Sequence, residues 1–264
     1  MKSSPGEWIP RAAWLAPGYA EWQAPAALRG AVSCLWAGIV PDAADRETLV
    51  LPDGCSDLIW EQGVGCYVAG PDTGPARSTS KAGTVIVGVR FRPSAGGQVL
   101  GLPLSEVRDR RVALADLLPA AAKRLPATLE PAQAAARMLD VTGLLVADGT
   151  PDPAMTRAAA LLRDPSARAE EVADGVGLSA RQFRRRCHAT VGYGPKTLQR
   201  VLHFRRFVRM LDAPAGPPDL AAAAALSGYA DQAHLTRECA ALSGLTPAAL
   251  ARVRNASGTV LKDR

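Results

Sequence analysis

The sequence predicts a mixed α/β N-terminal domain followed by an all-α C-terminal domain, in which a long helix joins two helix-turn-helix units. Three observations lead to this fold class. The chain of 264 residues is longer than one usual domain, and Gly and Pro punctuate it near residue 150. Its first part contains β-branched runs, whereas Ala, Leu and Arg recur at helical spacing in the second part. The second part also contains an internal repeat. We therefore expect domains at 1–150 and 151–254, with a flexible tail at 255–264.

The N-terminal domain is expected to combine strands and helices. Residues 49–60 and 84–92 are predicted strands, because the second run in particular is rich in β-branched residues. Residues 114–118 and 132–145 have the composition and spacing of helices. This mixture predicts an α/β domain without specifying its topology.

The internal repeat relates two stretches that lie about 50 residues apart. Nine positions keep their apolar, small or cationic character, with one extra residue in the second copy after Gly228. The first copy contains Ala173, Gly177, Phe183, Arg185, Cys187, Gly192, Pro195, Leu198 and Arg200. The second contains Ala224, Gly228, Leu235, Arg237, Cys239, Gly244, Pro247, Leu250 and Arg252. The repeat indicates one helical unit that was duplicated.

The first copy has the signals of a helix-turn-helix. A helix over 169–176 ends at Gly177, which can adopt the positive φ of a tight turn. Ser179 can cap a second helix over about 180–188, whose buried face carries Phe183 and Cys187. The opposite face presents Arg181, Arg184 and Arg185, with Gln182 beside them. Such a row of guanidinium groups suits the N7 and O6 acceptors of guanine in the major groove.

The second copy repeats this design. A helix over 220–227 leads to the turn at Gly228, and Asp231 can cap the helix that follows. Leu235 and Cys239 are expected to face inward. The candidate base contacts on its outer face are Gln232, Thr236 and Arg237. With fewer charges, this helix should contact bases less strongly.

A long helix from Pro195 to about Leu211 should join the two units, and its surroundings are strongly basic. Residues 1–150 carry 14 Lys and Arg against 15 Asp and Glu, whereas residues 151–264 carry 17 against 10. Between Ser179 and Met210 there are nine basic residues and no acid. A solvated face is the alternative, but such faces usually mix both signs. We expect phosphate contacts from Lys196, Arg200 and Arg205.

Residues 154–254 resemble the AraC/XylS family of transcription regulators. The stretch Gly228–Arg237, followed by Gly244-Leu245-Thr246-Pro247, is similar to the family signature. The resemblance implies seven helices, with both recognition helices in successive major grooves on one face of DNA. Base-contacting positions of the family fall on Arg181, Arg184 and Arg185, then Gln232, Thr236 and Arg237. The sequence departs from the family at Cys187 and Cys239, where Phe is usual.

The N-terminal domain resembles an uncharacterised domain found ahead of this DNA-binding module. The residues that carry this likeness are 51–60, Gly70-Pro71 and 89–93. In the wider family such domains sense small molecules or mediate dimerisation. All five tryptophans lie in the first 60 residues and either line a ligand pocket or belong to the core. For a small, partly apolar effector we predict Trp36 and Trp60 as pocket walls, with Asp57 or Arg90 as the polar group.

The sequence predicts no catalytic site, cofactor or metal site. Cys34, Cys55 and Cys66, together with Asp53 and Asp57, could in principle bind zinc, but their spacing fits no zinc pattern. All three histidines lie in the C-terminal domain. The alternative function is a thiol-based alkyl acceptor or redox-sensing enzyme fused to a DNA-binding module.

Cysteine usage and hydropathy predict a cytoplasmic protein. The five cysteines are odd in number and widely spread, which is typical of a reducing compartment. Neither a signal-peptide core nor an apolar stretch approaching the ~18 residues of a membrane span is visible. The expected partners are double-stranded DNA, a small-molecule effector, a second copy of the chain, and RNA polymerase if the protein is an activator.

Overall fold

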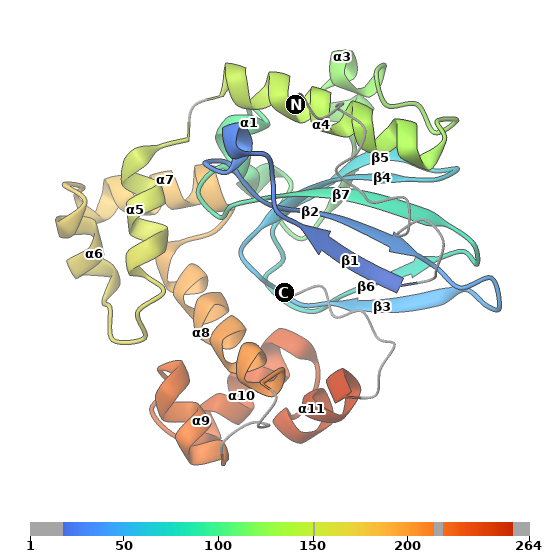
Figure 1. Cartoon of the computed structure of the whole chain (residues 1–264). Coiled ribbons are helices and arrows are strands. Elements are labelled where there is room, and N and C mark those ends of the chain that lie inside the picture. The colour runs from blue at the N-terminus through green and yellow to red at the C-terminus, as the bar shows by residue number, and fades with distance from the viewer. Residues whose placement is uncertain (1–17, 150, 214–218, 256–264) are drawn as a thin grey trace.

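An antiparallel sheet of six strands forms the centre of the N-terminal half (Figure 1). The computed structural model describes residues 18–149, 151–213 and 219–255. The strand order is β1-β2-β7-β4-β5-β8, and a second sheet pairs β3 with β6. The strands are β1 Gly18–Trp22, β2 Val32–Ile39, β3 Arg46–Val50, β4 Ser56–Glu61, β5 Gly65–Ala69, β6 Ala76–Ser80, β7 Val85–Phe91 and β8 Arg111–Ala113.

Strands were predicted at 49–60 and 84–92, and the structure has strands in both stretches. The second run is β7, but the first is interrupted between the end of β3 and the start of β4. Pro52 and Gly54 stand in this break, and Gly54 has a φ of 79°. Because Pro cannot donate to a ladder and a positive φ leaves the strand conformation, the chain changes sheets here.

Helices cover one face of the large sheet. They are α1 Gly96–Val99, α2 Leu114–Leu117, α3 Pro119–Ala122 and α4 Pro131–Asp148, with single 3-10 turns at Ala26–Leu28 and Leu104–Glu106. Met138 and Val141 of α4 pack on Leu58, Trp60 and other buried residues of the sheet. The predicted helices at 114–118 and 132–145 therefore correspond to α2 and α4.

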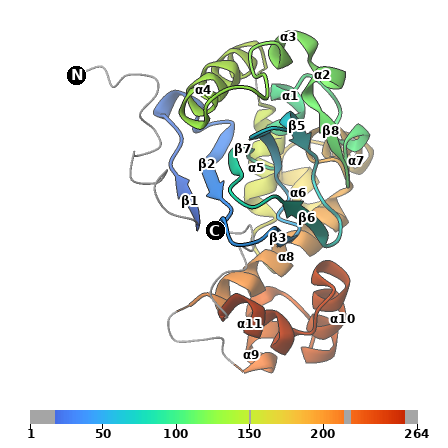
Figure 2. The ribbon, with the colours of Figure 1, turned by 90° about the vertical axis from the view of Figure 1, so that its right-hand side faces the viewer.

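The C-terminal half consists of helices, as predicted. They are α5 Pro153–Leu161, α6 Ala169–Gly175, α7 Ala180–Val191, α8 Pro195–Leu211, α9 Leu220–Ser227, α10 Gln232–Ser243 and α11 Pro247–Asn255. The pairs α6–α7 and α9–α10 are the two helix-turn-helix units, and α8 runs between them (Figures 1 and 2). This confirms the mixed α/β half, the all-α half and the long joining helix. The tail predicted at 255–264 lies outside the described residues, apart from Asn255.

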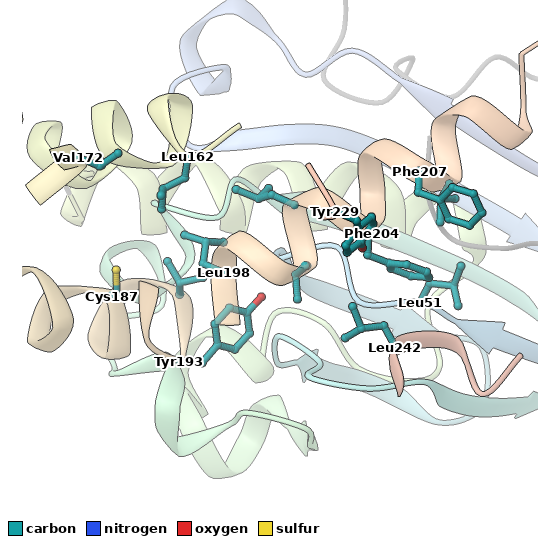
Figure 3. Close-up of a cluster of buried hydrophobic side chains, with 14 of the residues drawn as sticks. Leu51, Leu162, Val172, Cys187, Tyr193, Leu198, Phe204, Phe207, Tyr229 and Leu242 are labelled. Atoms are coloured by element: carbon teal, nitrogen blue, oxygen red, sulfur yellow. The ribbon is translucent and has the colours of Figure 1, made fainter. Parts of the chain in front are cut away.

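One hydrophobic core runs through both helix-turn-helix units (Figure 3). Phe204, Phe207 and Leu198 of α8 are fully buried in it, together with Cys187 of α7 and Cys239 of α10. Leu51, in the break between β3 and β4, also belongs to this core. The N-terminal half therefore packs directly on the joining helix. The domain boundary that we drew near residue 150 stays a prediction.

Within the described ranges, none of the helices is both long and apolar enough to cross a membrane.

Candidate functional site

The first recognition helix, α7, is held by its cap and by its buried face. Ser179 accepts a hydrogen bond from the backbone N–H of Gln182, whose side chain accepts in turn from the Ser179 N–H. This is the reciprocal capping arrangement that satisfies two otherwise unpaired N–H groups. Phe183 and Cys187 are buried against the core. The helix is thereby fixed in rotation, and the exposed side chains on its outer face are Arg181, Gln182, Arg184 and Arg185.

The second recognition helix, α10, is built in the same way. The Asp231 carboxylate accepts from the backbone N–H of His234 at 2.7 Å, and Leu235 and Cys239 are buried. Gln232 and Arg237 are exposed. Thr236 is only half-exposed, and its hydroxyl donates to the Gln232 carbonyl at 2.8 Å. The hydroxyl of Thr236 is thus already used within the helix.

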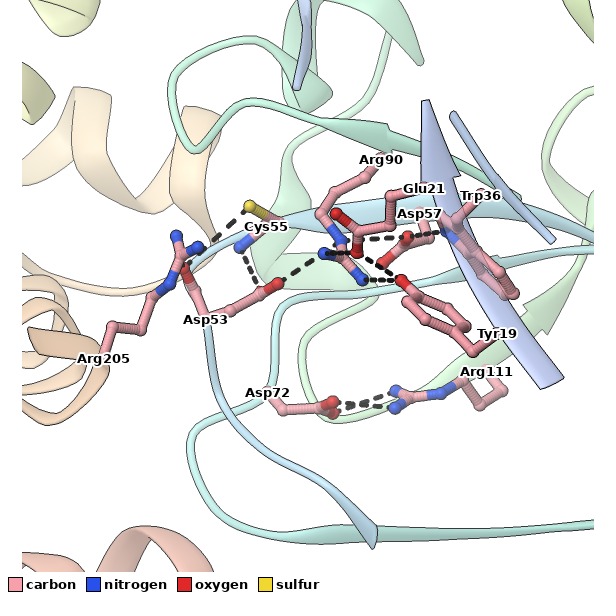
Figure 4. Close-up of polar contacts among 10 residues, drawn as sticks. All are labelled: Tyr19, Glu21, Trp36, Asp53, Cys55, Asp57, Asp72, Arg90, Arg111 and Arg205. Atoms are coloured by element: carbon pink, nitrogen blue, oxygen red, sulfur yellow. Dashed lines mark hydrogen bonds and ion pairs between the residues drawn. The ribbon is translucent and has the colours of Figure 1, made fainter. Parts of the chain in front are cut away.

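The three predicted phosphate contacts on α8 lie in different surroundings. Lys196 is exposed at the start of the helix. The Arg200 guanidinium instead pairs with the Glu238 carboxylate of α10, with N–O distances of 2.7 and 3.2 Å. Arg205 points toward the N-terminal half, where its Nη1 donates to the Asp53 carbonyl oxygen at 3.0 Å (Figure 4). Lys196 is thus exposed, whereas Arg200 and Arg205 are half-buried and have partners within the chain.

Burial and nearby cations lower the pKa of two histidines near these helices. His188 of α7 lies close to Arg184 and to Arg108 of the N-terminal half, and its pKa is lowered by burial and by both charges. For His203 of α8, burial and then Arg206 lower the pKa. Both imidazoles therefore favour the neutral form.

In the N-terminal half, three of the four predicted ligand residues meet in one polar cluster (Figure 4). The Trp36 indole N–H donates to Asp57 Oδ1 at 2.7 Å. Arg90 is only 1% exposed and lies 3.4 Å from Asp57, 3.5 Å from Asp53 and 3.2 Å from Glu21. Burial opposes the charge of Arg90, but the carboxylates outweigh this and hold its pKa above the usual range. Arg90 is therefore committed to internal ion pairs.

Trp60 lies on the other face of the sheet, apart from this cluster. It is fully buried in the core beneath α4, and its indole N–H donates to the Pro126 carbonyl at 3.0 Å. Successive side chains of a strand point to opposite faces, so Asp57 and Trp60, three positions apart on β4, cannot share a pocket. The structure thus separates Trp60 from the other predicted ligand residues.

A cavity of about 90 Å³ lies where the large sheet faces the sheet of β3 and β6. Trp36, Ile59 and Ile86 contribute apolar walls, and Arg46 and Tyr67 contribute polar groups. The Arg46 Nη2 atom is buried and has no hydrogen-bond partner. Sequence reasoning missed Arg46, although the alternation of Arg46, Thr48 and Val50 is the signal of one strand face.

The lining also contains Arg111, whose charge is already paired. Two N–O contacts of 2.9 and 2.7 Å join it to the Asp72 carboxylate. Burial raises the pKa of Asp72, while the hydrogen bonds from Arg111 act in the opposite direction. Within the described residues, no group of three or more His, Cys, Asp or Glu side chains is arranged to hold a metal ion.

The loop between β5 and β6 touches both helix-turn-helix units. A Cβ atom added at Gly192, where α7 ends, would lie 2.6 Å from Pro71. One added at Gly244, where α10 ends, would lie 3.7 Å from Pro75. Both glycines have positive φ angles, as expected at these helix ends. The N-terminal half is therefore in contact with the C-terminal ends of both recognition helices.

Comparison with known proteins agrees with this architecture. Residues 172–252 match the model of a helix-turn-helix domain, and residues 20–113 match a domain of unknown function, DUF6597. No curated protein matches the chain.

Solved structures of ToxT from Vibrio cholerae are similar in fold. One has 9% identity and a TM-score of 0.43, and the match covers 79% of this chain and 98% of ToxT. An apo ToxT variant has 10% identity and a TM-score of 0.40, and the match covers 89% of this chain and 96% of the variant. ToxT with a bound unsaturated fatty acid has 9% identity and a TM-score of 0.37, with 82% and 88% covered.

The fold and the two exposed recognition helices define a DNA-binding protein of the helix-turn-helix class. More particularly, residues 172–252 form an AraC-type helix-turn-helix domain, and a domain of unknown function precedes it at residues 20–113. The predicted resemblance of the C-terminal residues to an AraC-type helix-turn-helix domain is confirmed.

Proposed function

We propose that one chain reads two successive major grooves of a specific operator, with α7 in one groove and α10 in the next. The observation that carries this proposal is the pair of capped helices, of which α7 exposes a row of arginines and α10 exposes Gln232 and Arg237, with α8 between them. Because successive major grooves are ~34 Å apart, the operator should span about two helical turns. Its two halves should differ, since α7 presents arginines and α10 presents Gln232 and Arg237. Dimerisation and contact with RNA polymerase stay predictions.

Selection from a pool of random duplexes tests this proposal directly. The full chain should enrich an asymmetric site, and Arg185→Ala should cost about 1–3 kcal/mol and relax base preference at one position. Lys196→Ala is the matched control, because loss of a phosphate contact should weaken binding to all sequences alike. A palindromic site confined to one turn and bound by two chains would contradict the proposal.

We further propose that a small apolar acid binds in the cavity between the two sheets and regulates DNA occupancy. The walls formed by Trp36, Ile59 and Ile86 suit an apolar body. The buried, unpartnered Arg46 Nη2 supports an anionic group, because a guanidinium and a carboxylate form strong, charge-assisted hydrogen bonds. Of the predicted ligand residues, Trp36 lines this cavity, whereas Trp60, Asp57 and Arg90 do not.

Binding of the acid should be visible by calorimetry with a panel of small aliphatic and aromatic carboxylates. Arg46→Met should weaken the best carboxylate at least tenfold, while the matched amide should bind wild type and variant equally weakly. Arg77→Met is the control, because Arg77 lies on the neighbouring strand β6 but is 71% exposed and paired with Glu47. If the amide binds as tightly as the acid, Arg46 has no part in recognition.

The thiol-based alternative finds no support in the surroundings of the cysteines. Burial raises the pKa of Cys34 to about 12 and that of Cys66 to about 12, and it also raises the pKa of Cys55. A reactive thiol needs a lowered pKa, because the thiolate is the nucleophile. Intact mass after treatment with a methylating agent tests this, and the expected result is no stoichiometric adduct on these cysteines.

A further inference from the structure

An open groove of about 640 Å³ lies where the N-terminal half meets the first helix-turn-helix unit. Thr73, Arg108 and Asp109 line it from the N-terminal half. Arg184 of α7 and Lys196 of α8 line it from the other side. The groove beside the recognition helix therefore brings Arg108 of the N-terminal half close to three cations of the C-terminal half, Arg184, Lys196 and Arg200, of which Arg200 is paired with Glu238.

The positive charge of this groove is not cancelled by the acid that lines it. The Asp109 carboxylate accepts from the Thr73 backbone N–H at 2.6 Å and from the Thr73 hydroxyl at 2.9 and 3.0 Å. Its contact with Arg108 is longer, with 3.6 Å between Nε and Oδ2, and both side chains are more than 40% exposed. An exposed ion pair of this kind contributes little to stability. The arginine can therefore exchange this partner for another anion.

The backbone that carries Arg108 is held in a specific conformation. Asp109 has a φ of 57° and is the only non-glycine residue with positive φ in the described part of the chain. Its N–H donates to the Pro71 carbonyl at 3.2 Å, and its carboxylate holds Thr73. Strained conformations of this kind persist where the surroundings enforce them, and they cluster at functional sites. His188 of α7 lines the same groove as Arg108, and its pKa is lowered by burial first, then by Arg184 and Arg108.

We propose that Arg108 is a DNA contact contributed by the N-terminal half, which binds a backbone phosphate beside the major groove that α7 enters. The inference rests on the proposed function. A helix in the major groove has a phosphate backbone along each side, and the groove between Arg108, Arg184 and Lys196 opens next to the outer face of α7. Movement of the N-terminal half would then change DNA affinity directly, because one of the contacts belongs to it.

The test measures the salt dependence of binding by the full chain to a duplex selected from a random pool. Arg108→Ala should lower affinity about eightfold at 0.1 M salt and reduce the log–log salt slope by about 0.9, the value for one phosphate. Arg108→Lys should keep the slope because it keeps the charge. Arg110→Ala is the matched control, because Arg110 is exposed in the same loop, donates to the Glu106 carbonyl and does not line the groove.

The outcomes separate this inference from the proposed function. If Arg108→Ala leaves affinity and slope unchanged, or tightens binding, Arg108 is not a phosphate contact. The same follows if Arg110→Ala lowers the slope equally, because the effect would then be one of net charge. If the wild-type chain enriches no sequence, or Arg185→Ala has no effect on the selected duplex, the proposed function itself fails. Thermal unfolding of each variant verifies that the fold is intact.

Discussion

The sequence and the structure lead to different predictions for the role of Arg205. The run of basic residues predicts that Arg205 contacts phosphate. In the structure the residue is half-buried, and its Nη1 donates to the Asp53 carbonyl across the contact between the two halves. Arg205→Met keeps much of the apolar stem and removes the donor and the charge. We therefore expect the substitution to lower stability and to leave DNA electrostatics nearly unchanged.

The magnitude follows from the kind of hydrogen bond that is lost. A hydrogen bond from a charged donor contributes about 1.5–3 kcal/mol, and the lower end applies because Arg205 is only half-buried. With a urea m-value of about 3 kcal/mol/M, a loss of 1.5 kcal/mol moves the unfolding midpoint by roughly 0.5 M. The log–log salt slope of DNA binding should fall by much less than the 0.9 of one phosphate contact.

Urea unfolding followed by tryptophan fluorescence, together with salt titrations of DNA binding, measures both quantities. Arg181→Met is the comparison, because Arg181 is exposed on the outer face of α7. That variant should unfold within about 0.5 kcal/mol of wild type and should bind DNA more weakly. The reasoning is refuted if Arg205→Met leaves the midpoint unchanged and reduces the salt slope by about 0.9, because Arg205 would then be a phosphate contact after all.

Three further expectations concern the helices of the DNA-binding half and their contact with the N-terminal half. Ser179→Ala removes the cap of α7 and should cost about 1 kcal/mol in urea unfolding, and an unchanged midpoint would contradict the role of this cap. Gly97→Val places a side chain where even a Cβ would lie 2.5 Å from the Ala189 carbonyl oxygen, so it should cost about 1–3 kcal/mol and increase protease access to the contact between the halves. Folding lowers the pKa of His203 below its ordinary value near 6.5. The unfolded chain therefore binds a proton more readily than the folded protein, so stability should be lost as the pH falls below about 6.5. His203→Gln should flatten that decline, and equal pH profiles for variant and wild type would show that His203 does not cause it.

Local signals in the sequence were sufficient for the helices of the DNA-binding half. Ser179 and Asp231 cap recognition helices, and Gly177 and Gly228 have positive φ in the two turns, as expected. These features depend on interactions within a few residues, which a linear pattern records directly. The outward placement of Arg185 followed in the same way, because helical periodicity relates it to the buried Phe183.

The N-terminal half was much less predictable, because its sheets pair distant segments. Strand β3 pairs with β6 about 30 residues further along, and this pairing creates the cavity that Arg46 lines. The sequence located Trp36 and Trp60 among candidate pocket walls, but the two lie on opposite faces of the sheet. Strand register determines the face of each side chain, and register is set by partners that a linear pattern does not identify.

The sequence alone therefore established the class of protein, the two recognition helices and the residues on their outer faces, since short-range capping and periodicity determine them. It could not establish which cations remain available to DNA. Arg200 and Arg205 belong to the same basic run as Lys196, yet one pairs with Glu238 and the other with the carbonyl of Asp53, 38 and 152 residues away. Charge density is a property of the sequence, but the neutralisation of a charge depends on which distant segments fold against it.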